Sequence, residues 1–193
     1  MNPDVVTRDS VLAAAVRLLD LGFFRVGGEA YADENSTYGL ATLLEDHVSF
    51  DGGAVVFEYE AKSGKHRTTS IVDPDVLKLL QTLKRRRGGG DELLAYKDNS
   101  GRWRDVRSGD INRYLRELAA IEMTAKDFRT WHATVLMAVA LAVSSSVAGA
   151  ASTARERAVA RAYREVAGYL GNTPAVCRNP TSTPASSTDS TTA

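Results

Sequence analysis

The chain has 193 residues, of which 44% are hydrophobic and only 7% aromatic, so we expect one globular domain with a core of Ala, Leu and Val and a mainly helical fold. Its 24 basic and 24 acidic residues cancel, so the net charge gives no argument for a nucleic-acid partner. The single cysteine, Cys177, excludes an intramolecular disulfide, and three scattered histidines offer no metal-ligand cluster.

Basic residues gather in three places although the chain as a whole is neutral. The clusters are Lys84-Arg85-Arg86-Arg87, then Arg102, Arg104 and Arg107, and then Arg155, Arg157, Arg161 and Arg164. Taken singly, each is expected to form a solvated face. The N-terminus has no basic segment followed by an apolar run, so we expect no signal peptide and a cytoplasmic protein.

The first predicted element is an amphipathic helix over residues 7–22, with Thr7 or Asp9 as its N-cap. It leads into the run Phe-Phe-Arg-Val-Gly-Gly, in which Arg25 stands between apolar residues and a glycine pair. Residues 31–43 predict a turn-rich segment that returns to the core.

Three β-like runs follow, at residues 47–50, 54–60 and 67–72, with turn residues between them. They predict a three-stranded antiparallel meander with Lys62 at or beside the tip of the second hairpin. A lysine in that place is usually just solvated.

The second half of the chain predicts mostly helices. In order we expect a helix from Asp73-Pro74 to about Arg86, a short strand at 93–97 with a turn at 98–101, a helix capped by Ser108 to about Ala120, a helix over about 124–143, a loop at 144–152 and a helix over 153–170. After Arg178 no large apolar side chain remains, so residues 179–193 are expected to be disordered.

The longest apolar segment begins with Thr-Ala-Lys-Asp-Phe-Arg-Thr-Trp-His, where Thr124 can cap the helix and Asp127 completes a variant capping box. Arg129 is then on a rigid, largely buried helix, where it can bind a phosphate in a bidentate fork. The alternative is a structural Arg paired with a buried Asp or Glu. Residues 133–151 carry no charge, and their small polar residues favour a buried core helix over a membrane span.

Five motifs in order carry a family resemblance. They are Phe-Phe-Arg-Val-Gly-Gly-Glu, Tyr-Gly-Leu-Ala-Thr-Leu, Ala-Lys-Ser-Gly-Lys, Lys-Asp-Phe-Arg-Thr-Trp and Tyr-Leu-Gly-Asn-Thr-Pro-Ala-Val-Cys-Arg. Over residues 8–179 the chain strongly resembles the catalytic domain of bacterial type IB DNA topoisomerases. The resemblance implies the DNA breaking-rejoining enzyme core, an α+β fold that is mainly α with a small antiparallel meander, here over residues 1–178.

In that family a Tyr hydroxyl attacks a DNA phosphodiester, forms a 3′-phosphotyrosyl link, and lets the strand swivel before resealing; the enzyme is an isomerase and needs no metal or nucleotide cofactor. The resemblance makes Arg25 and Arg129 the cations on the phosphate oxygens, Lys62 the general acid for the leaving 5′-oxygen and Asn172 a further donor. Lys65 would replace Lys62 if the hairpin register were shifted.

Other implications concern DNA and partners. Lys126 is expected to touch a nearby phosphate, and the partner is double-stranded DNA, bound by a monomer associated with the nucleoid. The family normally has a further N-terminal domain that closes a clamp around the duplex. The resemblance begins where the catalytic domain begins, so a separately encoded domain would have to supply that clamp.

The family's nucleophile is nine residues beyond the position of Asn172, and Thr181 stands there. A Thr hydroxyl is shorter than a phenol and has a far higher pKa, so we expect no cleavage. Reading residues 180–188 one nucleotide out of frame permits Tyr at position 181, followed by Ile, Asp, Pro, Arg, Val, Ile and Asp. The tail is therefore hypothesised to be frameshifted, which the nucleotide sequence of the gene would decide.

Two alternatives come from the same residues. A noncatalytic duplex-binding module would retain the phosphate-binding residues without the reaction. A tyrosine recombinase shares the catalytic logic, but His132, three residues after Arg129, does not fit the His-x-x-Arg spacing that such enzymes usually carry.

Overall fold

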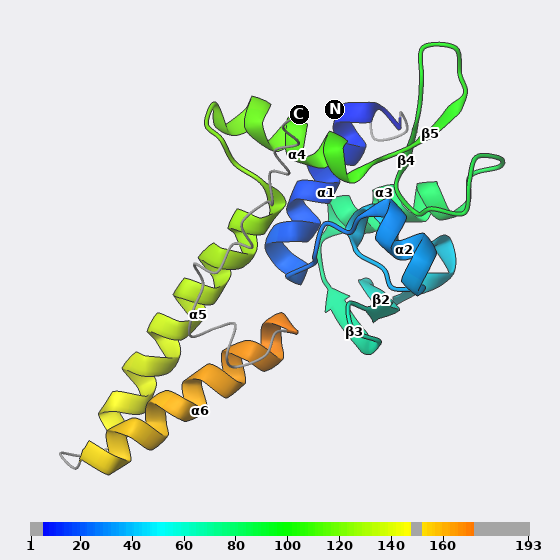
Figure 1. Ribbon diagram of the computed structural model, residues 1–193. Helices are drawn as coiled ribbons and strands as arrows, with labels where there is room; N and C mark the ends of the chain where they lie inside the picture. Colours follow the sequence, from blue (N-terminus) through cyan, green and yellow to red (C-terminus); the bar gives the residue numbers. More distant parts are fainter. Residues whose placement is uncertain (1–5, 148–151, 172–193) are drawn as a thin grey trace, which may run out of the picture. The chain divides into compact units, whose positions relative to one another are not determined.

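The computed structural model describes residues 6–147 and 152–171 (Figure 1). The chain forms two compact units, Met1–His132 and Ala133–Ala193, and each is described by itself. Helices dominate and the sheets are small and antiparallel, which confirms the α+β expectation.

The first unit is built around α1, Arg8–Gly22. Thr7 is its N-cap: the Thr7 hydroxyl accepts from the Ser10 amide at 3.1 Å, and the Thr7 amide donates back to the Ser10 hydroxyl at 3.0 Å. One face of α1 is fully buried, and α1 contacts α3 (Pro74–Lys84), α4 (Ser108–Ala119) and strands of both sheets. The predicted amphipathic helix is therefore the centre of the core.

The segment after α1 contains more helix than expected. α2 covers Glu29–Asn35 and ends where Ser36 takes a left-handed conformation, with φ of 49°. Two 3₁₀ turns follow, η1 at Leu40–Thr42 and η2 at Glu45–His47. The prediction of a purely turn-rich segment was wrong for α2, because seven polar and small residues show no apolar helical periodicity.

The meander is confirmed, with β1 at Val48–Asp51, β2 at Ala54–Ala61 and β3 at Lys65–Ile71 in the order β1-β2-β3. Along β2 the buried residues alternate, so one face packs on the core. The β2–β3 turn comprises residues 62–64, in which Ser63 and Gly64 have positive φ values of 68° and 65°. Lys62 therefore lies in the hairpin turn, as predicted.

α3 begins as predicted, with Asp73 as N-cap and Pro74 in its first turn. β4, Ala95–Lys97, pairs with β5, Trp103–Asp105, in a hairpin whose second strand was not predicted. α4 has Arg107 as its N-cap residue, so the prediction that Ser108 caps it was wrong. The amide and hydroxyl of Ser108 donate instead to the Glu29 carboxylate, at 2.7 and 3.0 Å.

α5 covers Ala125–Val147, and α6 covers Ser152–Leu170. The Asp127 carboxylate accepts from the Thr124 amide and hydroxyl, both at 2.8 Å, so one half of the predicted capping box forms, while the Thr124 hydroxyl donates where a capping box needs it to accept. The loop predicted to begin at residue 144 was wrong at its start, because α5 continues to Val147.

The expectation of a buried core helix after residue 133 was also wrong in the described part of that segment. Val135, Val139 and Val143 are 40%, 56% and 62% exposed. The prediction followed from the many Ala and Val residues of this segment. In the structure the residues between these three valines are half-buried or exposed, and none is buried. Within the described ranges, no helix has the length and apolar character needed to cross a membrane.

Candidate phosphate-binding site

The backbone of Arg25 is fixed by the motif Tyr-Gly-Leu-Ala-Thr. The Leu40 amide donates to the Arg25 carbonyl at 2.8 Å, and the Ala41 amide donates to the Val26 carbonyl at 2.7 Å. Gly39 permits this approach, since a Cβ there would lie 2.4 Å from the Gly27 nitrogen and 2.8 Å from the Arg25 carbonyl oxygen. The two glycine-containing motifs of the sequence thus place one arginine.

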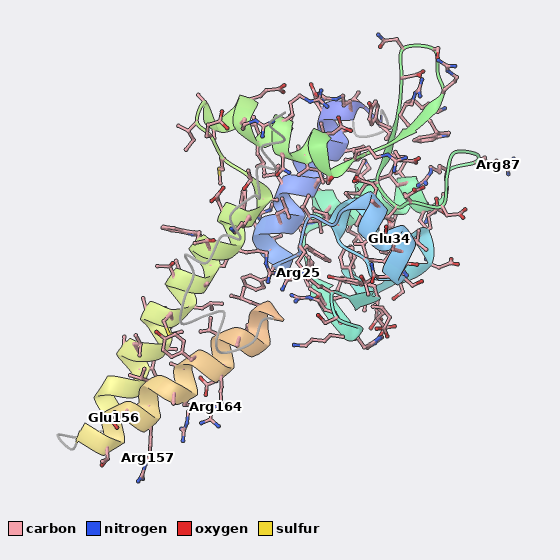
Figure 2. All side chains as sticks on the ribbon, in the orientation of Figure 1. Arg25, Glu34, Arg87, Glu156, Arg157 and Arg164 are labelled. Atoms are coloured by element: carbon pink, nitrogen blue, oxygen red, sulfur yellow. The ribbon has the colours of Figure 1, made fainter. Side chains whose placement is uncertain are left out.

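The C-terminal end of α1, just before Arg25, accepts hydrogen bonds from two other arginines. Nη2 of Arg67 donates to the Gly22 carbonyl at 3.1 Å, and Nη1 of Arg129 donates to the Phe23 carbonyl at 2.6 Å. Phe23 has a left-handed backbone, with φ of 53°, which ends the helix. A helix C-terminus carries partial negative charge, so guanidinium groups are favoured there. Figure 2 labels Arg25 beside this end of α1.

The charges of three arginines act on one buried phenol, that of Tyr59. Burial raises the pKa of Tyr59, while the positive charges of Arg67, Arg129 and Arg25 act in the opposite direction. Burial, and then the charge of Arg67, lowers the pKa of Arg25. Tyr59 itself is 4% exposed. Positive charge therefore gathers near a buried phenol whose ring stacks on Phe24, just after the end of α1, and such a place suits an oxyanion ligand.

The three lysines predicted to contact DNA lie on two different elements, the β2–β3 hairpin and α5. Lys62 lies three residues beyond Tyr59, in the β2–β3 turn, and is exposed. The Tyr38 amide donates to the Glu60 carbonyl at 2.7 Å, which ties the hairpin to the segment that fixes Arg25. Lys65 is exposed at the start of β3, and Lys126 is exposed in the first turn of α5.

The structure thus joins Arg25 and Arg129 through the Phe23 turn and leaves Lys62 at its predicted place in the hairpin. Asn172 and Thr181 lie outside the described residues. The sequence analysis did not identify Arg67 as a site residue and placed it only at the start of a predicted strand. The pairing register gives the missing signal: a turn of residues 62–64 places Arg67 directly opposite Tyr59.

His132 also packs against this turn. Its ring meets the Phe23 ring edge-on, with centroids 4.8 Å apart, and its Nε2 lies 3.4 Å from Oδ1 of Asp20. The side chain of His132 is 15% exposed. His132 therefore connects α5 to the last turns of α1 near Arg129.

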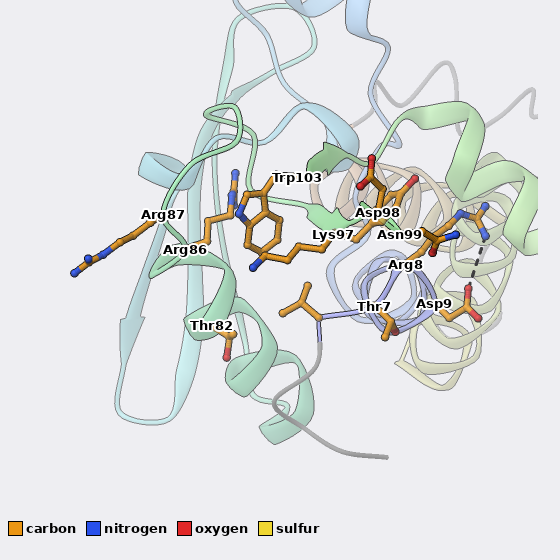
Figure 3. A pocket seen from close by; sticks show the side chains of 12 residues that line it. Thr7, Arg8, Asp9, Thr82, Arg86, Arg87, Lys97, Asp98, Asn99 and Trp103 are labelled. Carbon is orange, nitrogen blue, oxygen red and sulfur yellow. Dashed lines mark ion pairs between the residues drawn. The ribbon is translucent and has the colours of Figure 1, made fainter. Parts of the chain in front are cut away.

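Two residues of the first basic cluster, Arg86 and Arg87, line a separate cavity of about 910 Å³ that Figure 3 shows. The side chain of Arg86 is 1% exposed, pairs with Glu45 at 2.8 Å and donates to backbone carbonyls, so a solvated face was a wrong expectation for it. Arg86 and Lys97 lie 5.6 and 5.3 Å from the centroid of the Trp103 ring. Arg86 therefore stabilises the loop that follows α3.

A metal centre finds no support in the part of the chain that the structure describes, where no group of three or more His, Cys, Asp or Glu side chains could bind an ion. The positively charged groups near Tyr59 would also repel a cation.

Comparison with known proteins supports the same interpretation of the motifs. The family model described as "Eukaryotic DNA topoisomerase I, catalytic core" matches residues 2–192. DNA topoisomerase 1B of Acanthamoeba polyphaga mimivirus is 33% identical over 124 residues, which cover 61% of this chain and 35% of that protein. DNA topoisomerase 1 of Daucus carota is 28% identical over 139 residues, covering 69% of this chain and 16% of the plant protein.

DNA topoisomerase 1 of Candidozyma auris is 29% identical over 140 residues, covering 71% of this chain and 17% of the yeast protein. The chain thus spans about a third or less of the length of these relatives. Because they are viral and eukaryotic, the bacterial source suggested by the motifs stays a prediction. The match over almost the whole chain establishes that it belongs to the type IB DNA topoisomerase family, in the region of the catalytic core.

Proposed function

We propose that this chain is a type IB topoisomerase catalytic core that binds the phosphodiester backbone of duplex DNA and does not cleave it. The observation that carries the binding half is that Arg129 donates to the Phe23 carbonyl, two residues before Arg25, in the C-terminal turn of α1. Membership of a DNA topoisomerase family supports the proposal that this phosphate belongs to DNA.

The proposed binding mode follows from the chemistry of the side chains. Arg25 and Arg129 would each donate paired N–H groups to non-bridging oxygens of one phosphate. In an intact enzyme the same contacts strengthen as negative charge grows in the pentacoordinate transition state. Lys62, on its hairpin turn, would protonate the leaving 5′-oxygen, and Asn172 would donate to the phosphate.

The absence of cleavage rests on position 181. A phenol is acidic enough to attack a phosphodiester when cations surround the phosphorus, and acidic enough to leave again when the strand is resealed. The Thr181 hydroxyl has neither property and is several ångströms shorter in reach. The chain would therefore occupy DNA without forming a covalent link.

Duplex binding at several salt concentrations tests the proposal. We expect Arg25→Gln and Arg129→Gln each to weaken binding of a 20-base-pair duplex about tenfold and to lower the salt slope by about 1, because each removes a phosphate contact. Arg87→Gln removes the same charge from an exposed residue beyond α3 and is the matched control, with a change below about twofold. Equal losses in all three variants would contradict a defined phosphate site.

A further inference from the structure

Arg67 has so far been given no part in DNA binding. It is half-buried on β3, directly opposite Tyr59 on β2 in the antiparallel register. Opposite residues of such a pair extend from the same face of a sheet, and the Tyr59 side chain is buried in the core. Arg67 therefore brings a charge to the edge of the core, where a chain without a use for it would place an apolar residue.

The guanidinium of Arg67 bridges two elements. Nη2 donates to the Gly22 carbonyl at 3.1 Å, and Nε donates to the Thr69 hydroxyl at 3.3 Å on the same strand. The strand thus anchors the guanidinium, and the guanidinium anchors the end of α1. Gly22 lies three residues before Arg25, so this bond fixes the start of the turn that carries Arg25.

The same turn is fixed from its other side. A Cβ on Gly22 would lie 2.2 Å from the ring of Phe24, so the missing side chain lets the ring fold back beneath the helix end. Phe24 is fully buried. On either side of it, the Arg129 guanidinium donates to the Phe23 carbonyl and the Leu40 amide donates to the Arg25 carbonyl. Arg67 holds the turn at a further point, because its Nη2 donates to the Gly22 carbonyl.

We propose that Arg67 is a positioning residue: through the Gly22 carbonyl it holds the turn that aims Arg25 at the phosphate. The inference rests on the proposed function, because it assumes that Arg25 binds that phosphate. The charge of Arg67 supports the same role. Two guanidinium groups held close together repel each other, and an anion bound between them relieves this repulsion.

A double-mutant cycle on the full chain tests this role, with duplex affinity as the readout. We expect Arg67→Gln to weaken binding about tenfold when Arg25 is present. In an Arg25→Gln background the same change should cost less than twofold, since Arg25 is no longer there to be positioned. Arg67→Lys keeps one donor for the Gly22 carbonyl and should bind within about threefold of the original chain.

Arg17→Gln separates positioning from general loss of stability. Nε of Arg17, on α1, donates to Oδ2 of Asp73, the N-cap of α3, at 2.9 Å. Loss of this bond destabilises the first compact unit at a place remote from Arg25. We expect its affinity for the duplex to be unchanged at a temperature where both variants are folded. If Arg67→Gln lowered the duplex affinity by the same factor with and without Arg25, the inference would be overturned. Arg67 would then either contact a phosphate independently or stabilise the fold in general.

The outcomes also distinguish this inference from the proposed function. If Arg25→Gln and Arg129→Gln weaken binding but Arg67→Gln does not, only the positioning role is overturned. If Arg25→Gln itself has no effect on duplex affinity, the proposed function fails and the positioning role fails with it.

Discussion

At the scale of single residues, the site depends on a glycine that makes no contact with a ligand. Gly39 lies against the backbone of Gly27 and Arg25, and neither neighbour is the movable end of a flexible side chain. Any Cβ at position 39 must push the two segments apart. The glycine of the Tyr-Gly-Leu-Ala-Thr motif is therefore required for backbone packing, and only through that packing for binding.

Gly39→Ala should lower the free energy of unfolding by about 2 kcal/mol, in the range found for overpacked cores, and should weaken duplex binding by displacing Arg25. Gly109→Ala is the matched control. Position 109 is inside α4 with no atom within 4 Å of a new Cβ, so alanine there should be neutral or stabilise by up to about 1 kcal/mol. Denaturant unfolding measures both; equal stabilities for the two variants would contradict the close approach at Gly39.

Tyr59 gives a prediction for alkaline pH. Its pKa in the folded chain is raised by burial, so the folded state holds the phenolic proton more tightly than the unfolded state. This contribution is fully present below the unfolded pKa, near 10, and is lost as pH rises above it. Tyr59→Phe should therefore lose less stability between pH 8 and pH 11 than the original chain. Unfolding curves at the two pH values measure the difference, and parallel losses would contradict the buried phenol.

The sequence could predict part of this site. Arg25 and Arg129 stand in motifs whose neighbours are as distinctive as the arginines, so the family resemblance identified them. Arg67 follows from no such motif, and its role appears only when the strand register is known. The length of the β2–β3 turn sets that register, and one residue more or fewer would move Arg67 to the other face of the sheet.

At the scale of elements, the sequence predicted the helices and strands that have clear local signals, such as turn residues at their ends or a long apolar pattern. The meander was predicted because three β-like runs are separated by short segments that contain glycine and other turn residues. α2 and β5 were missed because seven and three residues are too few to show a period. The end of α5 was placed too early because three serines were taken for a loop, although a helix tolerates them.

The start of α3 offers a test of one such local signal. Oδ1 of Asp73 accepts from the Asp75 and Val76 amides at 3.1 and 3.0 Å, and Oδ2 accepts from Arg17. The bond from the Val76 amide, and then the bond from Arg17, lowers the pKa of Asp73 in the folded chain. Its contribution to stability is therefore present above the unfolded pKa and lost as pH falls through the folded one.

Asp73→Asn keeps a capping oxygen but cannot carry the charge that Arg17 binds. It should lower the free energy of unfolding by about 1 kcal/mol at pH 7, and the gap to the original chain should shrink as pH falls below about 4. Asp51→Asn, at an exposed strand end, should change stability by less than about 0.5 kcal/mol at pH 7. A gap that grows toward low pH would contradict the lowered pKa of Asp73 in the folded chain.

At the scale of the whole molecule, the family assignment and the predicted inactivity come from different parts of the chain. The family match extends over residues 2–192, and the cations of the site lie in the first compact unit. The residue that decides catalysis, Thr181, lies beyond the last described residue. The inactivity therefore rests on the chemistry of a hydroxyl group, and a change of sequence at that end of the chain is its natural test.

Restoring the family-like tail should restore the reaction. A variant with Thr181→Tyr and the run Ile-Asp-Pro-Arg-Val-Ile-Asp after it should nick duplex DNA and form a covalent protein–DNA adduct, detectable by its altered mobility in denaturing gels. The same variant with Arg129→Gln should form at least a hundredfold less adduct, since it loses stabilisation of the transition state. A restored chain that forms no adduct would contradict the proposal that the residue at position 181 is what prevents cleavage.

Relaxation of negatively supercoiled plasmid by the chain with its natural tail, in buffer without magnesium and at a protein concentration that saturates duplex binding, tests the central claim most directly. We predict full occupancy of the plasmid with no change in its linking number, because the Arg25–Arg129 site binds phosphate and position 181 carries a Thr hydroxyl in place of the attacking phenol. Relaxed topoisomers produced under these conditions would contradict the proposal that Thr181 cannot serve as the nucleophile.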